Sequence, residues 1–237
     1  MVNDKNIIRE NVAKIRENIA QAAQKSGRNA SDITLIGVTK TLHPTTINEI
    51  IEAGVTHLGE NRVQEFLPKY EELLPQSPTW HFIGHLQRNK VKQAVDKISF
   101  IHSIDSLELA KEVDKRAESL KKRIDILLEI NIANEPSKYG TCPEKANELA
   151  KHLFELKFIN FRGLMCVAPF VENGEKNRSF FSKMQKISYK IMLDFKKNSL
   201  YDIAPLELSM GMSDDYSVAI EEGATMVRIG TALAGNR

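Results

Sequence analysis

The chain has little cysteine, no long hydrophobic run and almost no net charge. Its two cysteines, Cys142 and Cys166, fit no metal or redox spacing, so both are expected to be packing residues in a reducing cytoplasm. No apolar run approaches the roughly 18 residues that a membrane span needs. The start of the chain also lacks the apolar core of a signal peptide. The sequence therefore predicts a cytoplasmic protein with no membrane partner.

The formal net charge is only +2, from 33 basic and 31 acidic side chains. Basic pairs such as Lys115-Arg116 and Lys196-Lys197 lie among acids at helical spacing, which is typical of solvated helix faces. A nucleic-acid interface would need a one-sided basic stripe, so no nucleic-acid partner is expected. No Pro/Gly/Ser-rich linker interrupts the chain, and residues 1–237 are expected to form a single domain.

Short apolar runs alternate with amphipathic segments along almost the whole chain. A first helix is predicted at the start of the chain, and Gly27 ends it. The apolar residues expected on one face of this helix are Ile7, Ile8, Val12, Ile15, Ile19 and Ala22. Strands are then expected near 33–38, 56–58, 80–83, 100–103, 124–130, 161–166, 206–209 and 226–229. Helices are expected near 45–53, 63–74, 88–95, 107–120, 143–156, 178–198 and 214–222.

The apolar runs are continuous rather than alternating, which indicates parallel strands covered by helices on both faces. Eight β-α units in this length predict an α/β protein with a single (β/α)8 TIM barrel and an extra N-terminal helix. An open doubly wound sheet remains the alternative, because periodicity alone does not show that the sheet closes.

Lys40 is the most informative single residue. It closes the apolar run at 33–40, directly before a loop. A lysine at the carboxyl end of a buried strand is expected to face a pocket with little water, where desolvation lowers its pKa. The unprotonated amine can attack a carbonyl and form a Schiff base. The alternative is a lysine that extends into solvent, as most lysines at strand ends do.

The segments after the last two predicted strands have the composition of a phosphate site. Ser209 and Ser213 offer hydroxyls on either side of a glycine, ahead of the helix expected near 214. Gly230 and Thr231 add backbone N–H groups after the eighth strand. The loops after strands seven and eight are the usual phosphate site of a (β/α)8 barrel. The same residue types are also common in turns and helix caps, so both interpretations stay open.

A reactive lysine opposite a phosphate site matches the requirements of pyridoxal 5′-phosphate. The aldehyde of this cofactor bonds to the amine, and its phosphate is held at the other end. A metal site at His81 and His85 is a rival interpretation, but Gly84 argues against a helix there and no helical zinc motif is present. A barrel enzyme that binds another phosphorylated ligand without a Schiff base is a third interpretation.

Five motifs resemble those of the YggS/PROSC family of pyridoxal phosphate homeostasis proteins, and together they extend over nearly the whole chain. They are Val38-Thr-Lys40, Gly59-Glu-Asn-Arg-Val-Gln-Glu65, Trp80-His-Phe-Ile-Gly-His-Leu-Gln-Arg-Asn-Lys90, Leu208-Ser-Met-Gly-Met-Ser-Asp214 and Val227-Arg-Ile-Gly-Thr231. The resemblance implies a fold like the N-terminal barrel domain of alanine racemase. It also implies that pyridoxal 5′-phosphate is held on Lys40 as a Schiff base.

The resemblance implies roles for further residues around the cofactor. It places Arg228 near the pyridine nitrogen. It assigns the phosphate to Ser209, Ser213, Gly230 and Thr231. It assigns the pocket around the ring to Asn61, His81 and Met165.

The same resemblance implies a carrier or buffer of the cofactor, without robust catalysis. In alanine racemase, a tyrosine from an additional domain of the partner subunit acts on the second face of the substrate. This chain ends at Arg237, soon after the last strand, so that domain is expected to be missing. Arg228 would oppose protonation of the pyridine nitrogen and weaken carbanion chemistry. A slow amino-acid racemase or another amine-processing enzyme is the alternative.

The resemblance thus implies a role in intracellular homeostasis of pyridoxal 5′-phosphate, in which the chain takes up, protects and releases the cofactor. The cofactor itself is the expected partner, and apo forms of enzymes that depend on it are expected to be transient partners. Because no second domain is expected to build a shared site, the chain is expected to be a monomer.

Overall fold

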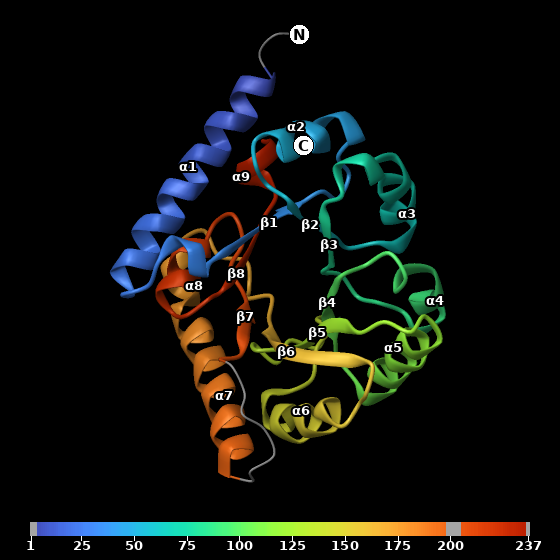
Figure 1. The fold of residues 1–237 in the computed structure, drawn as a ribbon. Coiled ribbons are helices and arrows are strands. Elements are labelled where there is room, and N and C mark those ends of the chain that lie inside the picture. The colour runs from blue at the N-terminus through green and yellow to red at the C-terminus, as the bar shows by residue number, and fades with distance from the viewer. Residues whose placement is uncertain (1–3, 198–204, 236–237) are drawn as a thin grey trace.

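A closed barrel of parallel strands forms the centre of the computed structural model, which describes residues 4–197 and 205–235 (Figure 1). The strands pair in chain order, and β1 also pairs with β8. They are β1 (Thr34–Val38), β2 (His57–Glu60), β3 (Thr79–Phe82), β4 (Phe100–Ile104), β5 (Ile124–Glu129), β6 (Ile159–Met165), β7 (Glu207–Ser209) and β8 (Met226–Ile229). The predicted TIM barrel is confirmed, and the pairing of β1 with β8 excludes an open sheet.

Helices surround the barrel, and all the predicted ones are present in the described ranges (Figure 1). They are α1 (Asp4–Lys25), α2 (Pro44–Glu52), α3 (Val63–Glu72), α4 (Val91–Ala94), α5 (Leu107–Ser119), α6 (Ala146–Phe154), α7 (Arg178–Lys197), α8 (Tyr216–Glu221) and α9 (Thr231–Ala234). Short 3-10 turns also occur, and two of them precede α4 and α6. Asn198, the last residue of one predicted helix, lies outside the described ranges. No helix within these ranges is long and apolar enough to cross a membrane.

Two local features differ from the sequence-based prediction. α8 begins at Tyr216 rather than near 214, because Asp214 and Asp215 form a turn in which the Asp215 carboxylate accepts the Met212 N–H at 2.7 Å. α9 was not predicted, because four residues are too few to show a helical period.

The larger hydrophobic core lies between the strands and the surrounding helices. Phe66 of α3 packs edge-on against Trp80 of β3, with ring centroids 5.2 Å apart. Trp80 is only 2% exposed. Burying large side chains of this kind stabilises the fold by about 1.5–3 kcal/mol each.

α1 lies outside the ring of strands and packs against α8, α9 and α2 (Figure 1). Its predicted apolar stripe is buried except for Ile7, which is 48% exposed because it lies near the free end of the helix, off the face that packs on the barrel. Asn18 Nδ2 donates a hydrogen bond of 2.8 Å to the hydroxyl of Tyr216 in α8. The N-terminal helix therefore covers the segment that carries the loops after β7 and β8.

The barrel interior holds a second, smaller apolar cluster. Its members are Ile36, Phe100, Leu127, Met165 and Met226. Beside this cluster lie buried polar side chains, namely His81, His102, Ser209 and Arg228. Buried polar groups are costly unless they are hydrogen-bonded, so their partners govern this part of the interior.

Candidate functional site at the carboxyl ends of the strands

Lys40 lies at the rim of the barrel, in the turn that follows the end of β1 at Val38. Its side chain is exposed. The prediction that its amine lies in water-poor surroundings is therefore wrong, because the strand ends before the lysine and the turn carries it out to the rim. Its predicted position at the carboxyl end of the first strand is confirmed.

Buried groups hold the backbone directly before Lys40. Lys69 Nζ of α3 donates to the Thr39 carbonyl at 2.7 Å and to Glu60 Oε1 at 2.6 Å. The Thr39 hydroxyl donates to the same carboxylate oxygen at 2.7 Å. Glu60 is fully buried and Lys69 is only 8% exposed, so water competes little for these charge-assisted bonds. Sequence reasoning missed Lys69, because a single lysine in an amphipathic helix is normally solvated.

The residue after Lys40 has an unusual backbone conformation. Thr41 has a φ of 63°, in the left-handed region that β-branched residues rarely adopt. Its N–H donates to Glu65 Oε2 of α3 at 3.0 Å. Such strain persists only where the surroundings impose it, and it concentrates at functional sites. The exposed amine of Lys40 therefore extends from a backbone that α3 holds on both sides.

Arg228 lies inside the barrel on β8, 4% exposed. Its Nη2 donates to the Cys166 carbonyl at 2.8 Å, and its Nη1 donates to the Ser209 hydroxyl at 2.7 Å. Burial lowers the pKa of the guanidinium, while Cys166 and the carboxyl groups of Glu129 and Asp215 act in the opposite direction. Ser209 is fully buried, so the structure places its hydroxyl beside Arg228 in the interior rather than at the rim.

The loops after β7 and β8 meet, as the phosphate prediction requires. Ser213 is half-buried, and its hydroxyl accepts the N–H of Ala232 at 3.2 Å. Gly230 directly precedes α9, and Thr231, its first residue, is exposed. Gly211 has a φ of 89°, and a Cβ there would lie 2.6 Å from the Ala219 side chain. Only glycine fits this close turn beneath the loops.

Asn61 and Met165 lie at the carboxyl ends of two strands that are not neighbours in the barrel. Asn61 follows β2, and its buried Oδ1 has no hydrogen-bond partner among the described residues. Gly84 packs on its backbone so closely that a Cβ would lie 2.2 Å from the Asn61 carbonyl oxygen. Met165 is the last residue of β6 and is fully buried in the interior cluster. Both residues thus lie at the carboxyl ends of their strands.

His81 and His85 do not share a site. His81 is buried in the barrel and hydrogen-bonds to His57 and His102. His85 stacks on Tyr139, with centroids 3.8 Å apart, and its Nδ1 lies 3.5 Å from Asp105 Oδ2. In the described part of the chain, no group of three or more His, Cys, Asp or Glu side chains could hold a metal ion.

The end of β5 and the loop after it line a further cavity. Lys138 Nζ donates to the Ala168 carbonyl at 3.3 Å, and Lys138 and Tyr139 line a cavity of ≈ 190 Å³ with Glu129. Burial and the charge of Asp105 raise the pKa of Glu129 to about 7, although Arg228 opposes the shift. A carboxyl group that titrates near neutral pH is typical of functional sites. Sequence reasoning missed Glu129, because its burial and its proximity to Asp105 depend on the folded barrel and not on the local sequence.

Comparison with known proteins identifies the family. Residues 11–237 match the family model described as the alanine racemase N-terminal domain. A pyridoxal phosphate homeostasis protein of Aquifex aeolicus is 42% identical over 228 residues, which cover 96% of this chain and 97% of the relative. The chain belongs to the pyridoxal phosphate homeostasis protein family. The member from Escherichia coli K12 is 36% identical over 235 residues, which cover 98% of this chain and 97% of that protein.

Solved structures agree with this family assignment. PipY of Synechococcus elongatus, determined with PLP bound, is 32% identical with a TM-score of 0.81, covering 96% of this chain and all of PipY. A protein of unknown function from Bifidobacterium adolescentis is 32% identical with a TM-score of 0.89, covering 98% and 96% of the two chains. Alanine racemase of Clostridium difficile shares the fold at 20% identity and a TM-score of 0.66, and the match covers 96% of this chain and 57% of the racemase.

Proposed function

We propose that this chain binds pyridoxal 5′-phosphate reversibly on Lys40 and acts as an intracellular carrier or buffer of the cofactor. The arrangement of Lys40 carries the proposal, since an exposed amine extends from a backbone that buried charges and a strained turn hold in place. The family to which the chain belongs is named for pyridoxal phosphate homeostasis, and PipY has been determined with this cofactor.

The residues at the carboxyl ends of the strands fit such a ligand. The meeting loops offer the Ser213 hydroxyl and the N–H groups around Gly230 and Thr231 to a phosphate, a common arrangement in this fold. Asn61 Oδ1 is a buried acceptor without a partner in the described ranges, and a polar ring substituent could use it. Met165 supplies an apolar contact at the floor. We assign Ser209 and His81 to the support of Arg228 rather than to direct contact.

The bound cofactor supplies an aldehyde, which condenses with an amine with loss of water. Lys40 presents the amine at the rim, where water and competing amines reach it, and this exposure favours release as well as capture. Arg228 keeps a positive charge in the interior, and a cation beside the pyridine nitrogen disfavours a proton there. Weak proton uptake at that nitrogen limits carbanion chemistry, so the arrangement supports storage more than turnover.

Reduction and mapping test the covalent role of Lys40. The purified protein should show a visible absorption band that disappears with borohydride, and peptide mapping should place the reduced adduct on Lys40. Lys40→Ala should lose the band, whereas Lys111→Ala, a change of an exposed lysine on α5, should keep it. An adduct on another lysine, or a band that survives in Lys40→Ala, would overturn the proposal.

A transfer assay separates a carrier from an enzyme. The loaded protein should reactivate an apo-enzyme that depends on pyridoxal 5′-phosphate, and Lys40→Ala should not. A slow racemase or amine-processing activity is the second candidate, because the fold is shared with alanine racemase. Stereochemical assays that show clear, Lys40-dependent turnover would favour that candidate. We further propose that the protein is cytoplasmic and monomeric. A molar mass near 26.8 kDa in analytical ultracentrifugation would support the monomer.

A further inference from the structure

Five polar side chains form a continuous hydrogen-bonded chain through the barrel interior. His57 Nδ1 lies 2.9 Å from His81 Nε2, and His81 Nδ1 lies 2.9 Å from His102 Nε2. His102 Nδ1 lies 2.9 Å from the Ser209 hydroxyl oxygen, which also accepts a hydrogen bond from Arg228. This histidine chain joins β2, β3 and β4 in order and then crosses the barrel to β7 and β8. Of these five side chains, Arg228 alone contacts the cofactor in the proposed function.

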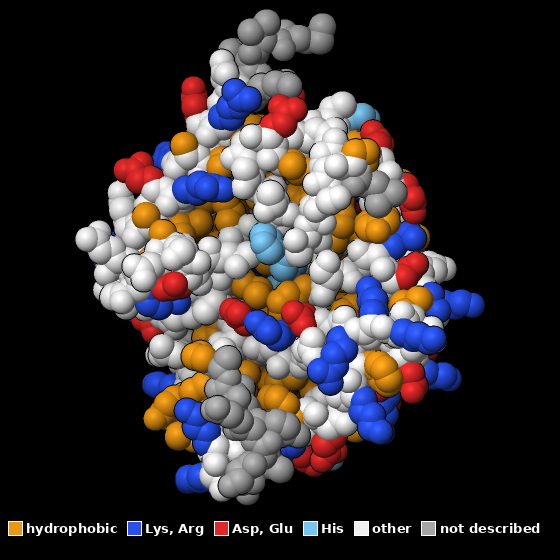
Figure 2. All heavy atoms as spheres, viewed as in Figure 1, with side chains coloured by type: hydrophobic (Ala, Val, Ile, Leu, Met, Phe, Trp, Pro, Cys, Tyr) orange, Lys and Arg blue, Asp and Glu red, His pale blue; other side chains and the backbone are white. Residues whose placement is uncertain are grey.

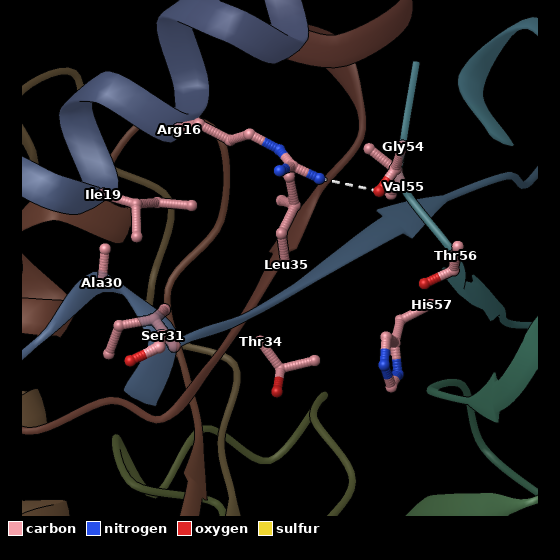
Figure 3. A pocket seen from close by; sticks show the side chains of 11 residues that line it. Arg16, Ile19, Ala30, Ser31, Thr34, Leu35, Gly54, Val55, Thr56 and His57 are labelled. Carbon is pink, nitrogen blue, oxygen red and sulfur yellow. Dashed lines mark hydrogen bonds between the residues drawn. The ribbon is translucent and has the colours of Figure 1, made fainter. Parts of the chain in front are cut away.

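The histidine chain begins at the opposite end of the barrel from Lys40. His57 is the first residue of β2 and is half-buried. It borders a pocket of ≈ 420 Å³ that also includes Arg16 and Thr34 (Figure 3). Histidine side chains are visible at the centre of the molecular face shown in Figure 2. The interior polar network therefore reaches the surface at the amino-terminal ends of the strands.

The hydrogen bond from Arg228 sets the direction of every other hydrogen bond in the histidine chain. A guanidinium only donates, so the Ser209 oxygen accepts from Arg228. His102 is the one other partner found for this hydroxyl in the described residues, so the hydroxyl hydrogen points to His102 Nδ1. His102 must then carry its proton on Nε2, as must His81 and His57 in turn. The reverse order would leave the Ser209 hydrogen without an acceptor.

Burial keeps the two inner rings neutral. Desolvation, helped by the charge of His57, lowers the pKa of His81 to about 3. Desolvation also lowers the pKa of the fully buried His102 well below its ordinary value, with His81 and Arg228 acting in the same direction. Each neutral ring then turns its acceptor nitrogen toward the Arg228 end. Aligned dipoles of this polarity stabilise a buried positive charge.

We propose that His57, His81, His102 and Ser209 are positioning residues for Arg228, which fix the guanidinium orientation through one polarised hydrogen-bond chain. The assignment of a cofactor contact to Arg228 rests on the proposed function. The polarity of the histidine chain does not, because it follows from the protein's own hydrogen bonds. The two parts can therefore be tested separately.

Nitrogen NMR of the unloaded protein tests the polarity. His57, His81 and His102 should each carry the proton on Nε2. Ser209→Ala should change the tautomer populations at His57, although His57 does not contact Ser209. Ser209→Thr should preserve them, and Ser188→Ala, a buried serine of α7, should leave them unchanged. A proton on Nδ1 in the natural chain, or an unaffected His57 in Ser209→Ala, would refute the proposal.

Absorption of the loaded protein tests the effect on the site. The visible maximum should shift in Ser209→Ala, return toward its original position in Ser209→Thr and stay constant in Ser188→Ala. If a Lys40-dependent band forms but does not shift in Ser209→Ala, the histidine chain does not position Arg228, and cofactor binding on Lys40 still stands. This comparison requires that the unloaded Ser209→Ala variant is folded, which a cooperative thermal transition would show. If the variant does not fold, the histidine tautomers of the natural protein still decide the polarity.

Discussion

Two cations of the proposed site, Lys40 and Arg228, have opposite surroundings. Lys40 is exposed at the rim, whereas Arg228 is buried and hydrogen-bonded to a carbonyl and a hydroxyl. An exposed amine can exchange covalent partners with molecules from solvent. A guanidinium remains a fixed charge because arginine stays protonated in proteins. This division suits reversible storage of a charged cofactor.

Glu129 makes stability depend on pH. Its pKa is about 7 in the fold against an ordinary 4.5, so the folded protein binds more protons than the unfolded chain between these values. Stability should therefore fall as pH rises from about 4.5 through 7, by up to about 3 kcal/mol from this group. In Glu129→Gln, which cannot ionise, the loss between pH 5 and pH 8 should shrink.

Urea denaturation of the unloaded protein at pH 5 and pH 8 measures this effect. Glu112→Gln is a suitable control, because Glu112 is an exposed acid of α5. Equal pH dependence in Glu129→Gln and the natural chain would show that Glu129 ionises normally in the fold.

At the scale of elements, α3 supports the turn that carries Lys40. Lys69 and Glu65 of this helix hold Thr39 and Thr41, the residues on either side of the lysine. The helix also packs Phe66 on Trp80, so the support is anchored in the larger core. The position of Lys40 therefore depends on β1 and α3 together.

Lys69→Met should destabilise the protein by about 3–5 kcal/mol, because it leaves the buried Glu60 carboxylate without its cation. The matched control Lys111→Met removes an exposed lysine and should change the free energy of unfolding by less than about 0.5 kcal/mol. Urea denaturation measures both. A loss below about 1 kcal/mol in Lys69→Met would mean that the Glu60–Lys69 pair is not needed to hold this turn.

At the scale of the whole molecule, the barrel has two ends with different chemistry. Lys40, Ser213 and Gly230 lie at the carboxyl ends of the strands, and half-buried His57 lies at the amino ends. α1 covers the outside where the chain returns to close the barrel, through contacts with α8 and α9. Closure of the barrel and the docking of α1 thus form one structural unit.

Ile15→Ala should therefore destabilise the whole barrel by about 2–5 kcal/mol, because Ile15 is 3% exposed in the core beneath α1. Ile7 on the same helix is 48% exposed, and Ile7→Ala should change stability by less than about 0.5 kcal/mol. Thermal denaturation should show a single transition in each case. A separate early transition in Ile15→Ala would show that α1 unfolds independently.

The strands and the order of the helices could be predicted because they depend on local patterns. Eight apolar runs and the stripe of α1 appear at nearly the positions that the structure shows. The exposure of Lys40 could not be decided from the sequence, because it depends on the path of the turn that follows β1 and not on the end of the strand, which was predicted correctly at Val38. The roles of Lys69 and Glu129 were missed for a related reason, since burial and contact partners are set by other elements.

The sequence by itself determined the fold class, the family and the residues that meet at the carboxyl ends, because hydrophobic periodicity and long motifs are written in the chain. Only the tertiary structure decided which side chains are buried and bonded. It placed Lys40 in solvent and Ser209 beside Arg228. It also aligned three histidines separated by 24 and 21 residues into one chain. Closure of the sheet brings these distant residues within hydrogen-bond distance, and no local pattern records that distance.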